Sequence, residues 1–247
     1  MSTIDIFLWG VAPYLSLTTL IVATAIRRVY FARTWTAKSS EFLEKKQERI
    51  ATPLFHLAIL MVFAGHVGGL LVPEEVTGSL GVSETMYHAV ALGMGGLAGI
   101  MLAVAVVLLI KRRFADTKRM RVNTSTMDKI MYVLLAFTII AGLTATLTNA
   151  DGNFNYRESL SPWIRGVLIL QPDPSLMVHA PIPFKVHMCG WMVLFAVLPF
   201  TRLVHLFSGV TAPFRYIGRA AIVYRRRKQK ETNRSLEFPS GVYKDER

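Results

Sequence analysis

The sequence has almost no cysteine. Cys189 is the only one among 247 residues, which excludes an internal disulfide, a zinc site made of several cysteines and an iron–sulfur cluster held by this chain alone. Cys189 lies inside a long apolar run, where a small thiol packs like any other apolar side chain. Any metal chemistry of this chain must therefore rest on other residues.

Charge is missing from the long apolar segments. Four of five such runs contain no Asp, Glu, Lys or Arg, and the fifth contains only Arg202. Each run suits the roughly 30 Å hydrocarbon core of a bilayer, which about 20 helical residues cross. The runs are 6–26, 51–72, 86–110, 130–150 and 186–207. With 52% hydrophobic residues and a mean hydropathy of +0.39, the sequence predicts an all-α integral membrane bundle of five transmembrane helices.

Basic residues gather in alternate connecting segments. Segments 27–50 and 111–121 and the stretch after 208 hold seven, six and ten Lys or Arg, which is 23 of the 28 in the chain, whereas segment 73–85 has none. Because positive loops face the cytoplasm, we expect the N-terminus outside, the C-terminus in the cytoplasm, and a multi-pass protein of the inner (cytoplasmic) membrane. The net charge of +12 then reflects topology and not a nucleic-acid partner.

The sequence predicts one membrane domain, 1–207, followed by a basic cytoplasmic tail, 208–247. The tail has two interpretations: attraction to anionic lipid headgroups, or a docking site for a soluble subunit. In the segment after the fourth run, apolar residues recur at helical spacing from Leu160 to Leu170. This pattern predicts a short helix along the outer membrane interface, anchored by Trp163.

Two prolines mark the predicted helices. Pro53 falls near the start of the second apolar run, so we expect it in the first turn of that helix, where a missing amide donor costs little. Pro199 lies inside the fifth run, and a kink is expected there.

Four histidines interrupt two of the apolar runs. His56 and His66 lie in the second run, and His187 and His205 lie in the fifth. An ionisable side chain in hydrocarbon is costly and usually functional. Because the second and fifth helices run in opposite directions, His56 pairs with His205 near the inner side and His66 with His187 near the outer side. Each pair can supply the two axial nitrogens of a haem.

The spacing of the histidines supports this pairing only in part. His187 and His205 are separated by about five helical turns, so they share a face of a straight helix. His56 and His66 are about 80° apart around their helix. The rise along the helix is about 15 Å from His56 to His66 and about 27 Å from His187 to His205. To match these depths, the pairing requires helix tilt or a kink at Pro199.

Other residues near these histidines suggest roles at the site. Gly65 and Gly69 flank His66 and leave room for a porphyrin face. Arg202 lies one turn before His205 and either pairs with a haem propionate or extends to the cytoplasmic interface. His88 opens the third run, where a quinol would need a proton acceptor that exchanges with outside water. We expect His179 to be a solvated loop residue.

The chain also resembles a known family. The stretch FHLAILMVFAGHVGG from Phe55 to Gly69, LLIKRRF around Lys111, PFTRLVH ending at His205, and RTWTAKSSEFLEKK in the first basic segment are similar to the gamma subunit, the cytochrome b, of membrane-bound respiratory nitrate reductase. The resemblance extends over nearly the whole chain, to about Tyr216.

This resemblance implies two b haems, with His56, His66, His187 and His205 as ligands. It implies quinol oxidation at the outer side, beside His66, Gly65 and Gly69, with proton release outside. Family members often carry a lysine early in the third helix that contacts the quinone; this chain has Ala89 there, so we assign that contact to the adjacent His88.

The implied partners are an iron–sulfur beta subunit and a molybdenum-containing alpha subunit on the cytoplasmic side, together with membrane lipid and the quinone pool. Electrons would pass through the two haems to the beta subunit, and the chain alone would not reduce nitrate. Three alternatives remain. They are the cytochrome b of a related sulfur-cycle or heterodisulfide-reductase-like complex, a haem-free transporter or proton channel with histidine relays, and a purely structural anchor.

Overall fold

The computed structural model describes residues 1–31, 48–114 and 124–207. The chain divides into two compact units, Met1–Leu203 and Val204–Arg247. Within the described ranges all regular structure is helical. The basic tail 208–247 and most of the first basic segment fall outside the described residues, and so does the predicted role of the tail.

The elements follow one another as a series of long helices joined by short ones. Two turns, η1 and η3, are π-helical, and η4 to η6 are 3-10 turns. The elements are α1 Thr3–Ile6, η1 Phe7–Val11, α2 Ala12–Tyr30, α3 Glu48–His66, η3 Val67–Leu71, α4 Glu74–Ser79, α5 Glu84–Phe114, α7 Thr126–Thr148, α8 Leu160–Leu168, η4 Pro174–Met177, α9 Ile182–Val197, η5 Leu198–Phe200 and η6 Arg202–Val204.

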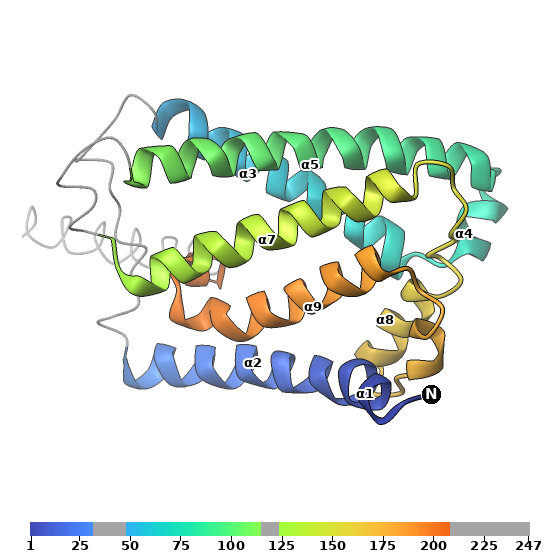
Figure 1. The fold of residues 1–247 in the computed structure, drawn as a ribbon, viewed down its shortest axis with the longest axis horizontal. Coiled ribbons are helices and arrows are strands. Elements are labelled where there is room, and N and C mark those ends of the chain that lie inside the picture. Colours follow the sequence, from blue (N-terminus) through green and yellow to red (C-terminus); the bar gives the residue numbers. More distant parts are fainter. Residues whose placement is uncertain (32–47, 115–123, 208–247) are drawn as a thin grey trace, which may run out of the picture. The chain divides into compact units, whose positions relative to one another are not determined.

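Among the described residues, five helical segments are long and apolar enough to cross a membrane, which confirms the predicted fold class. They are Thr3–Tyr30, Ile50–Leu71, Glu84–Phe114, Thr126–Thr148 and Ile182–Phe200. In the first unit α3 packs on α5, α5 on α7, α7 on α9, and α9 on α2 (Figure 1). The sidedness of the termini stays a prediction.

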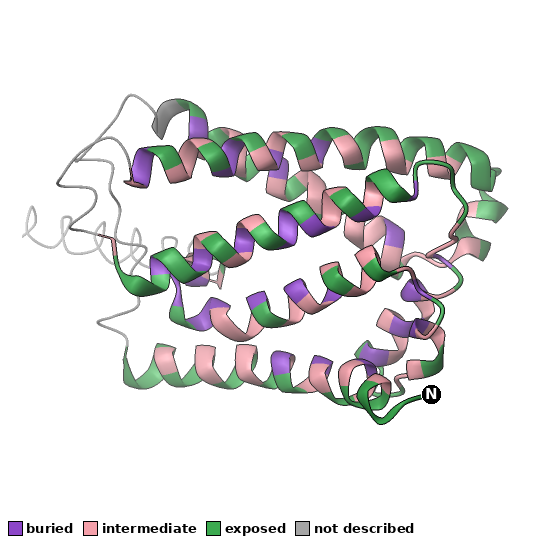
Figure 2. Ribbon diagram, viewed as in Figure 1, coloured by how far each residue is buried: buried purple, intermediate pink, exposed green. Residues whose placement is uncertain are grey.

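The five helices turn most of their side chains outward. Only 17% to 33% of the residues in the most apolar window of each helix are buried in the protein, and exposed residues recur along α2 and α5 (Figure 2). An apolar surface of this extent would be unfavourable in water. Lipid tails, which are as apolar as these side chains, are its natural solvent.

The fifth span ends earlier than the run 186–207 suggested. α9 stops at Val197, Pro199 lies in the 3-10 turn η5, and Thr201 is extended at φ −104° and ψ −179°. Proline has no amide hydrogen to continue the helix, and the Thr201 hydroxyl accepts from the Leu203 amide at 3.1 Å to begin a new turn. Pro199 therefore helps to end the helix, and the expectation that His187 and His205 share one straight helix was wrong.

The position of Pro53 also differs from the prediction. α3 begins at Glu48, so Pro53 lies within the helix and not in its first turn. The helix begins before the uncharged part of the run, because charged residues are compatible with a helical turn outside the hydrocarbon. The predicted start rested on the loss of charge at residue 51, which marks hydrophobicity and not the helix boundary.

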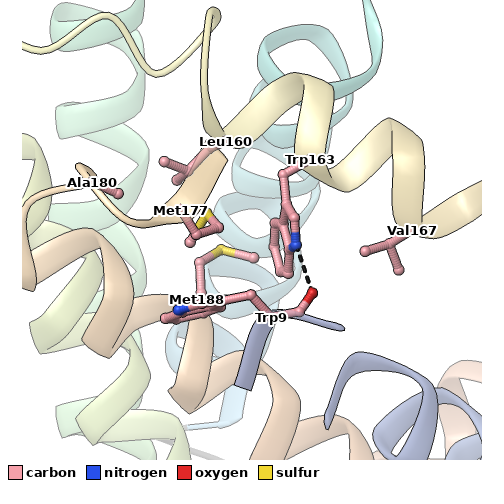
Figure 3. Packing of buried hydrophobic residues seen from close by; sticks show 7 residues of the cluster. All are labelled: Trp9, Leu160, Trp163, Val167, Met177, Ala180 and Met188. Carbon is pink, nitrogen blue, oxygen red and sulfur yellow. Dashed lines mark hydrogen bonds between the residues drawn. The ribbon is translucent and has the colours of Figure 1, made fainter. Parts of the chain in front are cut away.

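The short helix α8 confirms the predicted helix near Leu160, but not the role of Trp163. The Trp163 indole is only 1% exposed, meets Trp9 edge-on with centroids 5.7 Å apart, and donates from Nε1 to the Trp9 carbonyl at 2.8 Å (Figure 3). Trp9 belongs to the π turn η1. The indole is therefore buried in the protein and does not anchor α8 in a lipid interface.

This buried cluster joins the N-terminal turn η1 to α8, η4 and the start of α9. Its members are all less than 9% exposed and come from η1, α8, η4, the following turn and α9. They are Trp9, Leu160, Trp163, Val167, Met177, Ala180 and Met188 (Figure 3). The Ser161 hydroxyl of α8 donates to the Gly69 carbonyl in η3, so the packing of α8 also fixes the turn that follows α3.

Candidate functional site

His66 and His187 meet across the bundle. His66 is the last residue of α3 and His187 lies in the second turn of α9. Their ring centroids are 6.0 Å apart and the ring planes are tilted by 40°. The outer pair predicted from antiparallel helices is thus brought together by the structure.

His56, His66 and His187 each present the same ring nitrogen, Nδ1, to a backbone carbonyl. Because a carbonyl only accepts, Nδ1 must carry the hydrogen, and the lone pair stays on Nε2. This is the usual way in which a ligating histidine is oriented and made more basic. The Nδ1–O distances are 2.7 Å from His66 to Val62, 2.9 Å from His187 to Thr138 and 2.8 Å from His56 to Thr52.

Trp191 is the third ring of this cluster. Its Nε1 donates to His187 Nε2 at 3.0 Å, and its centroid lies 5.9 Å from that of His66. This bond confirms which nitrogen of His187 carries the lone pair. A metal bound through His187 Nε2 has to replace this hydrogen bond, so the indole borders the coordination position.

Two glycines decide where the ligand rings can go. A Cβ on Gly142 of α7 would lie 2.7 Å from His187 Cε1, so only glycine lets this ring rest against α7. A Cβ on Gly65, beside His66, would meet no atom within 4 Å. The His187 ring is therefore closely packed against α7, and the position of a Cβ on Gly65 is open.

The donor set fits a haem with two axial histidines. Two metal–nitrogen bonds of about 2 Å and roughly 1 Å from each nitrogen to its ring centre give a centroid separation of about 6 Å. The separation of His66 and His187 is 6.0 Å, and the lone pair of each ring is on Nε2. No group of three or more His, Cys, Asp or Glu side chains gathers in the described ranges, and a haem needs only two ligands from the protein.

The two histidines of the predicted inner pair belong to different units of the chain, so each is described by itself. His56 lies on α3 in the first unit and its ring is oriented by Thr52. His205 lies in the second unit, which begins at Val204. Their pairing, and the role of both as ligands, stays a prediction.

Arg202 lies against a carboxylate that the sequence analysis did not single out. Its Nε contacts Asp128 Oδ1 at 2.5 Å and a terminal nitrogen donates to Oδ2 at 2.9 Å, while Arg113 donates to Oδ2 at 3.2 Å. Asp128 is only 2% exposed. Its carboxylate also caps the Ser125 amide at the start of α7. Two arginines thus neutralise one buried carboxylate, and the predicted propionate contact of Arg202 stays a prediction.

A sequence signal for Asp128 existed. Ser125 and Asp128 have the spacing of a capping box immediately before an apolar run. This pattern predicts a helix start, which the structure has, but it does not reveal the two arginines. These come from the end of α5 and from the segment after α9.

Gly69 lies in the π turn η3 that follows His66, and two tyrosines surround it. A Cβ on Gly69 would lie 3.2 Å from the Tyr87 hydroxyl and 3.6 Å from the Tyr156 hydroxyl. A π turn leaves backbone carbonyls without helical donors and often marks a functional site. Here the Ser161 hydroxyl of α8 donates to the Gly69 carbonyl at 2.8 Å.

Arg157 connects α4 and the start of α5 to the segment before α8. It is 4% exposed, contacts Glu84 at 2.5 Å and Thr77 at 2.6 Å, and its guanidinium carbon lies 3.9 Å from the centre of the Tyr87 ring. Charge and cation–π contacts of this kind rigidify a site when they are buried. Arg157 was not among the residues singled out from the sequence.

His88 and His179 lie away from the paired histidines. His88 Nε2 donates to the Ala150 carbonyl at 3.1 Å, and its ring borders Gly152. His179 is exposed, as expected for a loop residue. The catalytic role assigned to His88 and its contact with a quinone stay predictions.

The chain matches a protein family and several known proteins. A family described as nitrate reductase gamma subunit matches residues 5–227. The nitrate reductase gamma chain of Bacillus subtilis is 44% identical over 221 residues, covering 89% of this chain and 97% of that protein. The respiratory nitrate reductase 2 gamma chain of Escherichia coli is 29% identical over 229 residues, covering 91% and 98%.

A third relative is longer. The nitrate reductase-like protein NarX of Mycobacterium tuberculosis is 41% identical over 224 residues, which are 90% of this chain but 34% of that protein. The matches confirm the resemblance seen in the sequence motifs, and they extend over all five candidate spans. On this evidence the chain belongs to the nitrate reductase gamma subunit family.

Proposed function

We propose that this chain is the membrane cytochrome b subunit of a quinol:nitrate oxidoreductase complex, and that it oxidises quinol at the outer side of the cytoplasmic membrane. The observation that carries the proposal is the His66–His187 pair, with centroids 6.0 Å apart and both Nδ1 atoms held by carbonyls. Membership of the gamma subunit family supports it independently.

The histidines act as ligands in this proposal. His66 and His187 hold an outer haem, and His56 and His205 hold an inner one, with Arg202 available for a propionate. A b haem supplies one-electron redox chemistry whose potential depends on its ligands and on the burial around them. The hydrogen bonds to the Val62 and Thr138 carbonyls fix the ring orientations, so both imidazoles would be held in place for a haem iron.

Quinol oxidation also needs a destination for protons. The His88 Nε2 hydrogen is used by the Ala150 carbonyl, so Nδ1 carries the lone pair that can accept a proton. His88 lies near the start of α5, on the predicted outer side. We assign it the role of general base beside the outer site, with Gly65 and Gly69 lining the space for the quinol ring.

Nitrate reduction belongs to partners in this proposal. Electrons leave on the cytoplasmic side to an iron–sulfur beta subunit, which feeds a molybdenum-containing alpha subunit. Protons stay outside while electrons move inward, so turnover charges the membrane. Moving one charge through 100 mV costs about 2.3 kcal/mol, which the drop in redox potential between quinol and nitrate has to exceed.

A spectrum of the purified complex tests the proposal. We expect a reduced-minus-oxidised difference spectrum with a b-type alpha band, which appears when menadiol, a short naphthoquinol, is added. Absence of the band would contradict the cytochrome, and a band that only dithionite produces would contradict quinol oxidation. A soluble partner without molybdenum would assign the chain to a different quinone-linked complex.

A further inference from the structure

We propose that the hydroxyl groups of Tyr87 and Tyr156 form the hydrogen-bonding site for the quinol headgroup beside His66. The proposal rests on the proposed function and names two residues for the substrate site. Both phenols approach Gly69, in the turn that directly follows the ligand helix α3. Among the described residues, these two tyrosines supply the atoms nearest to the position that a Cβ of Gly69 would occupy.

The two hydroxyls are linked but not saturated. Tyr156 donates to the Tyr87 oxygen at 3.5 Å, a long hydrogen bond. Within the described part of the chain, no acceptor is found for the Tyr87 hydroxyl hydrogen. A quinone oxygen can accept that hydrogen, and a quinol hydroxyl can donate to the same phenol oxygen. A phenol can therefore serve both redox forms, because it donates and accepts.

Arg157 pre-orders the pair. Its guanidinium lies over the Tyr87 ring and is tied to Glu84 and Thr77, and the buried Ser161 hydroxyl fixes the facing turn at Gly69. A site whose side chains are already ordered loses less entropy when a ligand binds. Gly65, which precedes His66 in α3, has no atom within 4 Å of the position of a Cβ, so a ligand ring at this surface would meet no side chain there.

Tyr87 and His88 are consecutive and serve different functions in this arrangement. Tyr87 reaches Gly69, whereas His88 turns toward Ala150 and Gly152. Burial raises the pKa of the Tyr156 phenol, and the bond to Tyr87 raises it further, so this hydroxyl stays protonated and able to donate. The tyrosines bind and orient the headgroup, and proton acceptance is left to His88.

The test compares four conservative variants of the whole complex: Tyr87→Phe, Tyr156→Phe, the double variant with both changes and, as a matched control, Tyr14→Phe. Tyr14 is also a half-buried phenol, but its hydroxyl donates to Val167 at 3.1 Å. Two quantities are measured: the Kd for menadione in an equilibrium titration and the KM for menadiol. The dithionite-reduced spectrum shows whether the haem site is intact.

We expect Tyr87→Phe to raise both constants about five- to tenfold, the effect of one lost hydrogen bond. Tyr156→Phe should raise them less, and the double variant should not exceed the product of the two effects. Tyr14→Phe should leave both constants unchanged. Unchanged constants in Tyr87→Phe with an intact spectrum would overturn the inference.

If Tyr87→Phe loses its haem spectrum, Tyr156→Phe decides: unchanged constants there overturn the inference. The two proposals fail in different ways. Menadione that binds to the wild type more tightly than to Tyr87→Phe, with no reduction by menadiol, would remove the proposed function and leave the binding site standing.

Discussion

His66 and His187 face each other at 6.0 Å, but their rings are oriented by different helices. The carbonyl that holds His66 belongs to Val62, four residues earlier in α3, whereas the carbonyl that holds His187 belongs to Thr138 of α7. α7 is therefore a positioning element for the pair, although it carries no histidine of its own.

Replacing either histidine of the pair should remove one b haem. His66→Ala and His187→Ala each leave a single axial nitrogen, and we expect about half of the haem per complex to be lost, with quinol oxidation abolished. Pyridine haemochrome analysis measures the haem. His179→Ala, at an exposed loop position, is the control. Full haem content in both alanine variants would refute the outer site.

Gly142→Ala should disturb His187 without touching a ligand atom. The added methyl would lie 2.7 Å from Cε1, and overpacking of this kind typically costs about 1–3 kcal/mol. We expect lower thermal stability in detergent and weaker haem retention. Gly93→Ala is the matched control, because its Cβ meets no atom within 4 Å and alanine favours a helix by up to about 1 kcal/mol. Equal behaviour of the two variants would show that the His187 ring can move freely.

Asp128→Asn should destabilise the protein strongly. The carboxylate is buried and contacts both Arg113 and Arg202, and removing one partner of a buried charge cluster costs about 3–5 kcal/mol. The unfolding midpoint in detergent should fall by several degrees. Asp151→Asn, at an exposed position, should leave the midpoint unchanged. A midpoint of Asp128→Asn equal to the wild type would mean that the cluster adds nothing.

Stability should decrease at alkaline pH in a way that depends on Tyr156. Its pKa is raised above the ordinary value of 10.0 by burial, so the unfolded chain loses this proton at a lower pH than the folded chain. The stabilisation is complete below about pH 10 and is lost as pH rises further. Unfolding midpoints between about pH 8 and 11 should fall more steeply for the wild type than for Tyr156→Phe. Parallel curves would contradict the burial of this phenol.

The sequence allowed the spans and the outer histidine pair to be predicted. The absence of charge over about 20 residues can be read directly from the sequence and does not depend on how the chain folds. The five apolar runs therefore predicted the five helices. The encounter of His66 with His187 followed from opposite helix directions alone. Sequence distance along a helix was less useful, because the break at Thr201 separates His187 from the segment after it.

The contacts that hold the site could not be predicted in the same way. Arg113, Asp128 and Arg202 come from three separate segments, and no local pattern joins them. The same holds for Trp163, whose indole found the Trp9 carbonyl and not a lipid interface. The orientation of Tyr87 toward Gly69 depends on how α5 packs on α3, which periodicity does not determine.

The turn from Leu198 to Thr201 interrupts the helix, so α9 and the segment after the turn do not share one helical register. Arg27 donates to the Pro199 carbonyl from one side, and Asp128 holds Arg202 from the other. One residue inserted inside α9 before His187 would rotate that ring by about 100° around the helix. One residue inserted in the turn would not rotate the His187 ring, because the turn is outside α9. Homologues should therefore vary in length in this turn more readily than within α9.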